Sequence, residues 1–192
     1  MNQHKTALRQ QLRLLRREMG QQQRSIESVQ IMSLLEAQPC FQKAHIVLCY
    51  AAMEEEVNTN PLIKKWHRSK TLLLPVVEGN HLQLKTFVDE ENMQTGAFGI
   101  QEPTGPVFKN YASIDLILIP GLGFDPQGGR IGFGRGFYDR LLQHPSLHNT
   151  PKWGLAFDAQ LIQHIPMEQH DIKMDAIITP NQFYLCKQPL IQ

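Results

Sequence analysis

Residues 114–142 read IDLILIPGLGFDPQGGRIGFGRGFYDRLL, and this stretch decides the fold. The run Ile114–Ile119 is short and largely apolar, which is typical of a strand buried inside a sheet. Pro120 ends this strand, and Phe137–Leu142 is predicted to form a short helix. Open α/β sheets bind ligands at the loops that follow their strands. The segment Gly121–Gly136 is therefore the first candidate for a binding site.

Two helices are predicted near the N-terminus. The first carries an apolar stripe with spacings of three and four residues, formed by Leu8, Leu12, Leu15 and Met19. Gly20 follows this stripe and is expected to end the helix. The second helix is predicted from about residue 25 to residue 37. Its expected buried positions include Ile26, Val29 and Leu34.

Strands and helices alternate along the rest of the chain. Strands are predicted at His45–Tyr50, Thr71–Val77, His81–Phe87, Ile114–Ile119, Trp153–Phe157, Ala176–Thr179 and Phe183–Cys186. A helix is predicted from about residue 60 to residue 70, and a turn at residues 78–80 makes a hairpin of the strands beside it. Residues 88–113 are expected to be rich in loops. This order predicts an α/β fold, a single layered α/β/α domain over residues 1–192, Rossmann-like, with a mixed, largely parallel sheet.

The composition excludes several classes of protein. The chain has 192 residues, a net charge of +1 and 42% hydrophobic residues, so it is unlike a disordered chain and long enough to bury a core. Such a charge gives no reason to expect a nucleic-acid or membrane partner. The three cysteines show no pair spacing and the N-terminus is polar, so we expect a cytoplasmic protein.

The charges are unevenly placed, because residues 1–24 hold six basic residues and one acidic residue. Lys5, Arg9, Arg13 and Arg16 recur at spacings of four, four and three. They form a basic stripe that borders the apolar stripe of the same helix. Lys5 and Arg9 lie one turn apart, so they could contact phosphates as a pair. A solvated basic face is the alternative.

The segment Gly121–Gly136 contains seven glycines in sixteen positions. Three of them, at positions 132, 134 and 136, allow the backbone to approach an anion with its amides turned inward. Arg130 and Arg135 add charged donors, and the following helix begins at the same place. The spacing matches neither the Walker loop nor the dinucleotide fingerprint. The pattern therefore favours a phosphate-binding loop and leaves a tightly turned surface loop as the alternative.

Three carboxylates are candidates for metal or substrate binding. Asp139 lies in the first turn of the helix after the glycines, where it is either a Mg²⁺ ligand or an acid favoured by the helix dipole. Asp175 precedes the strand at 176–179 and is either a ligand or a turn residue. Glu56 ends a run of three acids after a buried strand. It lies either at the rim of a substrate site or in a solvated loop.

Taken together, these segments resemble the 5-formyltetrahydrofolate cyclo-ligase family, also called methenyltetrahydrofolate synthetases. The Arg130–Asp139 block is the most specific match, and the resemblance covers nearly the whole chain in order. The matching segments are Lys5 with Arg9, Glu56–Thr59, Phe98–Pro103, Pro120–Asp125, Gly129–Arg140, Gly154–Asp158, Gln160 and His170–Asp175.

The resemblance implies a ligase of one-carbon metabolism that depends on ATP and Mg²⁺. It would convert 5-formyltetrahydrofolate into 5,10-methenyltetrahydrofolate and release ADP and phosphate, by phosphorylation of the formyl oxygen and intramolecular ring closure. The implied nucleotide contacts are Lys5, Arg9, Arg130, Ile131, Gly132, Phe133, Gly134, Arg135, Gly136, Phe137 and Tyr138. The implied folate contacts are Ala51, Glu56, Phe133, Gly134, Arg135, Gly136 and Phe137. Arg130 and Arg135 would be the catalytic residues, and Asp139 and Asp175 would hold Mg²⁺.

Two residues depart from the family's pattern. Arg135 stands where many members carry Gly or Lys, and its guanidinium could reach either a phosphate or the folate's glutamate tail. Phe137 stands where Tyr is common, so a hydroxyl is lost while ring stacking is kept. The expected partners are a reduced folate and ATP, with no nucleic acid and no membrane, and the protein is expected to act as a monomer. A folate- or ATP-binding module, an RNA-associated protein and a sugar-phosphate isomerase are the other classes considered.

Overall fold

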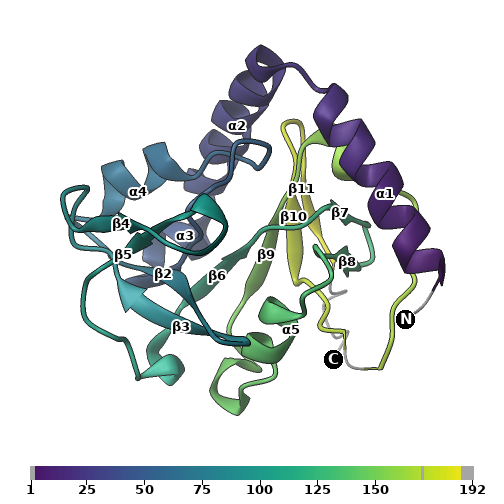
Figure 1. Ribbon diagram of the computed structural model, residues 1–192. Coiled ribbons are helices and arrows are strands. Elements are labelled where there is room, and N and C mark those ends of the chain that lie inside the picture. Colours follow the sequence, from purple (N-terminus) through teal and green to yellow (C-terminus); the bar gives the residue numbers. More distant parts are fainter. Residues whose placement is uncertain (1–2, 170, 187–192) are drawn as a thin grey trace, which may run out of the picture.

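The computed structural model describes residues 3–169 and 171–186 of the chain. Seven of the described strands form one sheet in the order β11-β10-β9-β6-β1-β2-β3 (Figure 1). Their bounds are Ile46–Leu48 for β1, Thr71–Glu78 for β2, His81–Thr86 for β3, Leu116–Ile119 for β6, Lys152–Leu155 for β9, Ala176–Ile178 for β10 and Phe183–Leu185 for β11. The five inner strands are parallel, and β3 and β11 are antiparallel edge strands. The predicted mixed, largely parallel α/β sheet is confirmed.

Five α-helices, four short 3-10 helices and two short hairpins complete the described elements. The helices are α1 (Gln3–Glu18), α2 (Gln21–Glu36), α3 (Pro39–Lys43), α4 (Asn60–Trp66) and α5 (Phe137–Leu142). The hairpins pair β4 (Met93–Thr95) with β5 (Gln101–Pro103), and β7 (Gly123–Phe124) with β8 (Arg130–Ile131). The first hairpin lies in the segment 88–113, which was expected to be mainly loop. No helix in the described part of the chain is both long and apolar enough to pass through a membrane.

The sheet is buried on both faces because its strands send apolar side chains alternately to opposite sides. Val47 and Leu72 face a cluster that includes Ile31 and Leu35 of α2 and Phe41 of α3. The intervening strand residues, such as Leu48, face a second cluster that contains Leu141 and Leu142 of α5. Helices α2, α3 and α4 therefore cover one face, and α5 covers the other. This is the predicted arrangement of three layers.

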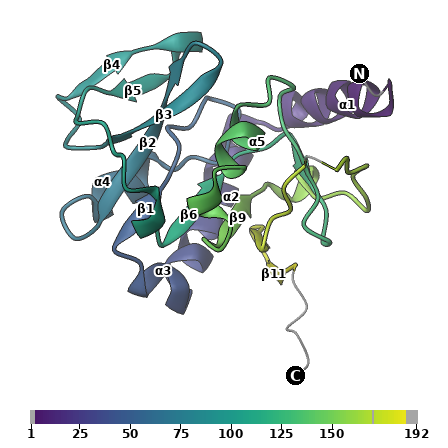
Figure 2. The same ribbon diagram turned by 90° about the horizontal axis from the view of Figure 1, so that it is seen from below.

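Helix α1 belongs to neither of these layers. Its Leu12 is 1% exposed and packs with Leu122, Ile131 and Ile165 in a third apolar cluster. Figures 1 and 2 both show α1 apart from the other helices, beside the segment that carries β7 and β8. Leu8, Leu12 and Leu15 of the predicted apolar stripe thus pack beside the glycine-rich segment, whereas Met19 packs against the core on one face of the sheet.

Helix α2 differs from its prediction in extent and in orientation. It begins at Gln21, and Ile26 and Val29 are exposed to 49% and 69%, so the prediction that they are buried is wrong. Its inner face instead includes Glu27, whose carboxylate accepts a hydrogen bond of 3.1 Å from the backbone N–H of Asp158. The same rotation buries Ile31, Met32 and Leu35 in the core, so apolar packing and this polar contact together orient the helix.

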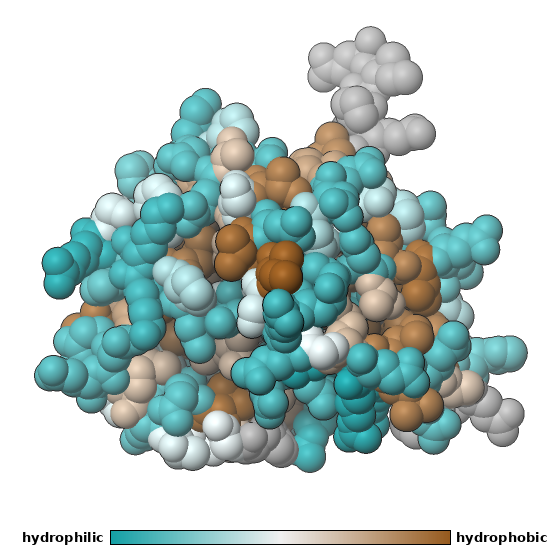
Figure 3. All heavy atoms as spheres, turned by 90° about the horizontal axis from the view of Figure 1, so that it is seen from above, coloured by the Kyte–Doolittle hydropathy of each residue, from teal (hydrophilic) through white to brown (hydrophobic). Residues whose placement is uncertain are grey.

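Figure 3 shows the apolar groups on the face seen from above as separate spots among hydrophilic side chains.

The glycine-rich segment is a packed hairpin rather than an open loop. The ring of Phe124 is fully buried between Gly121 and Gly154. A Cβ at Gly154 would lie 2.4 Å from the ring, and one at Gly121 would lie 2.8 Å from it. These glycines are required by close packing, since any side chain there would displace the ring that anchors the hairpin to the sheet.

Substitution Gly154→Ala tests this anchoring. The added methyl group overpacks the Phe124 site, so the free energy of unfolding should fall by about 1–3 kcal/mol in chemical denaturation. Gly20→Ala is the matched control, since a Cβ at Gly20 meets nothing within 4 Å. The control should lose only a few tenths of a kcal/mol. Equal stability of the two variants would contradict the packing described.

Candidate active site

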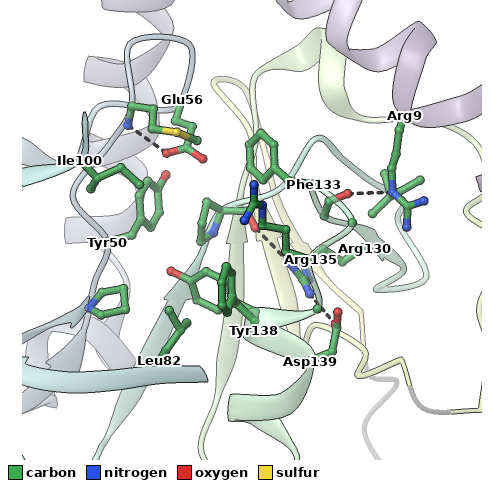
Figure 4. A pocket seen from close by; sticks show the side chains of 18 of the residues that line it. Arg9, Tyr50, Glu56, Leu82, Ile100, Arg130, Phe133, Arg135, Tyr138 and Asp139 are labelled. Atoms are coloured by element: carbon green, nitrogen blue, oxygen red, sulfur yellow. Dashed lines mark hydrogen bonds and ion pairs between the residues drawn. The ribbon is translucent and has the colours of Figure 1, made fainter. Parts of the chain in front are cut away.

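A cavity of about 680 Å³ lies where the parallel strands end. Its walls are α1, the segment that follows β1, the residues from β8 to the start of α5, and the outer part of the β2–β3 hairpin. Figure 4 shows side chains from these walls turned toward one another, with Glu56 and Tyr50 on one side and Arg130 and Asp139 on the other. The cavity therefore unites segments that are far apart in the sequence.

Helix α1 is fastened to the glycine-rich segment by its basic stripe. The Nε of Arg9 donates to the carbonyl oxygen of Gly132 at 3.1 Å, and Arg13 donates to the carbonyl oxygen of Phe133 at 3.2 Å. These two hydrogen bonds hold the backbone carbonyl groups of Gly132 and Phe133 in one orientation. The basic stripe thus both lines the cavity and fixes the opposite wall.

The turn from β8 into α5 depends on backbone conformations that favour glycine. Gly134 has φ of +100° and Gly136 has φ of +67°, a region that other residues adopt only with strain. These two turns bring Phe133, Arg135 and Tyr138 to the same cavity. The glycine pattern in the sequence therefore reflects a sharply turned wall that exposes backbone to the cavity.

Arg130 forms the centre of this wall. Its guanidinium donates to Asp139 Oδ1 at 2.6 Å and to the carbonyl oxygen of Pro120 at 3.4 Å. Its Nε is buried and has no hydrogen-bond partner among the described residues. The side chain is held rigidly at the end of β6 and keeps one donor that a bound anion could use.

A second buried cation of the cavity lies on α1. Lys5 is 7% exposed and forms ion pairs with Asp171 and with Glu168, the latter at 3.6 Å. The two buried cations Lys5 and Arg130 are thus each paired with a carboxylate of the cavity.

Glu56 occupies a different part of the cavity. Its side chain is largely buried, at 6% exposed, and Oε2 accepts the backbone N–H of Met53 at 3.0 Å. Burial raises the pKa of this carboxyl group to about 7, although the Met53 hydrogen bond and the nearby Arg16 charge both act to lower it. Glu56 is consequently able to accept or donate a hydrogen bond near neutral pH.

Asp175 does not lie with the other predicted site residues. It precedes β10 at the amino end of that strand, where Oδ2 accepts the backbone N–H of Lys152 at 2.9 Å. The cavity lies beyond the carboxyl ends of the parallel strands, so it is lined by Asp171 and Glu168 instead. Of the two aspartates in this stretch, Asp171 therefore lines the cavity and Asp175 does not, and the role of Asp175 as a metal ligand stays a prediction. His170 lies outside the described residues.

The structure brings all the other predicted site residues to the cavity. They are Lys5, Arg9, Ala51, Glu56, Arg130, Ile131, Gly132, Phe133, Gly134, Arg135, Gly136, Phe137, Tyr138 and Asp139. The sequence reasoning assigned no site role to Asp171, Glu168, Tyr50 or Arg16, which also line it. Arg16 was recognisable as the last member of the basic stripe, whereas Tyr50 and Glu168 carried no local signal.

Comparison with known proteins shows the family of this chain. The model of the 5-formyltetrahydrofolate cyclo-ligase family matches residues 1–180. The chain belongs to this family. It is 31% identical over 180 residues to the 5-formyltetrahydrofolate cyclo-ligase of Escherichia coli K12, covering 90% of this chain and 98% of the relative. The mouse cyclo-ligase is 29% identical over 191 residues, covering 93% and 94% of the two chains. The protein is therefore an enzyme of the cyclo-ligase family.

Solved structures of cyclo-ligases share the fold. The NMR structure of Aquifex aeolicus 5,10-methenyltetrahydrofolate synthetase superimposes with a TM-score of 0.85 at 33% identity and covers 96% of this chain and 94% of its own. The Mycoplasma pneumoniae 5,10-methenyltetrahydrofolate synthetase gives a TM-score of 0.72 at 23% identity, covering 92% and 98%, which shows likeness of fold alone. The fold of this chain is thus that of the Aquifex aeolicus enzyme over nearly the whole length of both chains.

The raised pKa of Glu56 predicts a dependence of stability on pH. A carboxyl group whose pKa rises on folding favours the folded state below its unfolded pKa of about 4.5, and that contribution is lost as the pH rises through about 7. Glu56→Gln mimics the protonated acid at every pH. The variant should match wild type near pH 4.5 and exceed its unfolding free energy by on the order of 2–3 kcal/mol at pH 8. A stability difference that stays constant from pH 4.5 to 8 would refute the raised pKa.

Proposed function

We propose that this cyclo-ligase uses ATP and Mg²⁺ to convert 5-formyltetrahydrofolate into 5,10-methenyltetrahydrofolate, with ADP and phosphate as the other products. The observation that carries the proposal is one cavity that unites two buried cations, Lys5 and Arg130, with the carboxylates of Asp139 and Asp171. Phosphoryl transfer needs cations and a metal site at the same place. The names of the relatives supply the substrate class.

The chemistry begins with a poor electrophile. The formyl group is bonded to a nitrogen whose lone pair delocalises into the carbonyl. The formyl oxygen would attack the terminal phosphorus of ATP, forming an O–P bond as ADP leaves. The second folate nitrogen would then attack the formyl carbon and lose its proton, and the C–O bond would break to release phosphate. The phosphoryl transfer is an in-line attack and the ring closure is intramolecular, so positioning would provide much of the rate enhancement.

The cations of the cavity would hold the phosphates. Lys5 and Arg9 reach it from α1, and Arg130 lies opposite them with a buried donor that has no partner among the described residues. Arg130 and Arg135 would neutralise the charge that develops on the transferring phosphoryl group. The turned backbone of residues 131–138 would wrap the nucleotide.

Two carboxylates fit a Mg²⁺ site. Asp139 and Asp171 both line the cavity, and each pairs with a cation that is predicted to bind phosphate. No set of three or more His, Cys, Asp and Glu side chains within residues 3–169 and 171–186 is grouped to hold a metal ion. Mg²⁺ commonly binds one or two carboxylates together with substrate phosphates, so a larger cluster of ligands is not required. When bound, Mg²⁺ would neutralise phosphate charge and help to orient the transferring group.

The folate would occupy the side of the cavity that contains Glu56 and Ala51. Glu56 is buried and can accept hydrogen bonds from the pterin, and the aromatic rings of Phe133 and Phe137 offer apolar contact. This placement puts the formyl group between Glu56 and the phosphate-binding cations. We also propose that the enzyme acts as a cytoplasmic monomer and that its activity requires neither a nucleic acid nor a membrane.

The proposal predicts an absolute requirement for both co-reactants. Incubation of the protein with 5-formyltetrahydrofolate, ATP and Mg²⁺ should produce the absorbance of the methenyl product, with one ADP formed for each folate consumed. Omission of ATP, or removal of Mg²⁺ with a chelator, should abolish the signal. Turnover without ATP would favour an isomerase, and tight folate binding without turnover would favour a binding module.

The position of the metal is tested by comparing two aspartates of one segment. Asp171→Asn should raise the Mg²⁺ concentration needed for half-maximal ATP binding by about tenfold or more, because a metal ligand is lost. Asp175→Asn should leave this concentration unchanged, because the amide oxygen can still accept the Lys152 N–H. Isothermal titration calorimetry with ATP at several Mg²⁺ concentrations measures both variants. The reverse result would restore Asp175 as the ligand.

A further inference from the structure

Arg16 is a buried cation of the cavity whose guanidinium lacks most of its hydrogen bonds. It is 4% exposed, and only one nitrogen of its guanidinium has a hydrogen-bond partner, Glu55 Oε2 at 2.9 Å. The other two nitrogens, Nε and NH1, are buried without a partner among the described residues. The guanidinium also lies over the ring of Phe133, 5.1 Å from its centroid. Its position is therefore fixed from two sides while two donors remain unused.

Buried N–H groups without hydrogen-bond partners destabilise the folded state. Buried guanidinium N–H groups lose their hydrogen bonds to water, and a folded protein normally replaces them. Arg16 lines the cavity, so an acceptor on a bound ligand can supply the missing contacts. NH1 would present an N–H group to that acceptor with little further loss of side-chain freedom, because the planar guanidinium is already held in place.

The charges around Arg16 indicate what kind of acceptor fits. Glu55 already neutralises Arg16, and Glu56 adds a second carboxyl group whose pKa responds to the Arg16 charge. A carboxylate of the ligand would therefore lie beside the carboxyl groups of Glu55 and Glu56, whereas the second cation near Glu55, Arg17, is largely exposed and screened by solvent. A neutral carbonyl oxygen has no such repulsion. The matching ligand carries a carbonyl oxygen for Arg16 beside N–H donors for Glu56.

A reduced pterin has such an edge, with its 4-oxo oxygen next to the N3–H and 2-amino groups. We propose that Arg16 binds the 4-oxo oxygen of the folate substrate while Glu56 accepts from the neighbouring N–H groups. This inference rests on the proposed function. Arg16 is then a binding residue that selects an oxo-pterin and fixes the orientation of its ring, and Phe133 holds the guanidinium in place.

Arg16→Met tests the proposal by equilibrium binding of three ligands. Met keeps an unbranched side chain in the buried site but removes all N–H donors. The Kd of 5-formyltetrahydrofolate should rise about tenfold to a hundredfold. The Kd of 5-formyltetrahydropterin, which lacks the glutamate tail, should rise by the same factor. A 4-amino analogue lacks the acceptor, so its Kd should change by less than about twofold.

Arg17→Met is the matched control. Arg17 lies next in the sequence and reaches the same Glu55 at 3.6 Å, but its side chain is 67% exposed at the rim. Its loss should leave all three Kd values within about twofold of wild type. The affinity of both variants for ATP with Mg²⁺ should equal that of wild type, which reports that the cavity is still folded.

The other outcomes each overturn the proposal. A loss confined to the tailed folate would assign Arg16 to the tail carboxylate, and an equal loss for the 4-amino analogue would make its role structural. If Arg16→Met does not unfold cooperatively, Arg16→Lys keeps the charge without the planar guanidinium that holds the NH1 donor in place, and it should still weaken both oxo ligands at least about fivefold. Unchanged affinity in that variant refutes the contact. A wild-type protein that neither binds nor converts 5-formyltetrahydrofolate refutes the proposed function itself.

Discussion

The site depends on the packing of Leu12 against the glycine-rich hairpin. Leu12 is buried with Leu122 and Ile131, and a Cβ at Gly123 would lie only 2.7 Å from it. This contact places α1 across the carboxyl ends of the parallel strands, where a helix outside the three layers can supply the cavity with side chains. Because α1 is amphipathic, the same rotation that buries Leu12 brings Arg16 and its basic neighbours to the cavity. Fold and site are therefore set by one interface.

The charges of the site are balanced before any ligand is bound. Arg130 pairs with Asp139, and Lys5 pairs with Asp171, so buried cations and carboxylates stabilise one another. Buried charges are tolerated only when they are paired in this way. Under the proposed function, the phosphates and the metal would take over these partners together. The pairing allows a chain with a net charge of +1 to hold several cations around one cavity.

The sequence predicted those features that depend on local patterns. The apolar runs predicted the parallel strands. The glycines and arginines between residues 130 and 139 predicted one wall of the cavity. It could not predict features set by contacts between distant segments. The rotation of α2, for example, buries Ile31 and Leu35 against the sheet together with the Glu27 contact to Asp158, and it leaves Ile26 exposed. The position of Asp175 away from the cavity was not predictable for a related reason, because the strand boundary decides which edge of the sheet an adjoining residue occupies.

The proposed function requires that nucleotide and folate bind side by side in the cavity between α1 and the glycine-rich hairpin. A crystal structure of the protein with a non-hydrolysable ATP analogue, Mg²⁺ and 5-formyltetrahydrofolate tests it most directly. The account predicts the terminal phosphate between Lys5 and Arg130, and the pterin ring beside Glu56. Either ligand bound outside this cavity, or a folate oriented with its formyl group away from the phosphates, would contradict it.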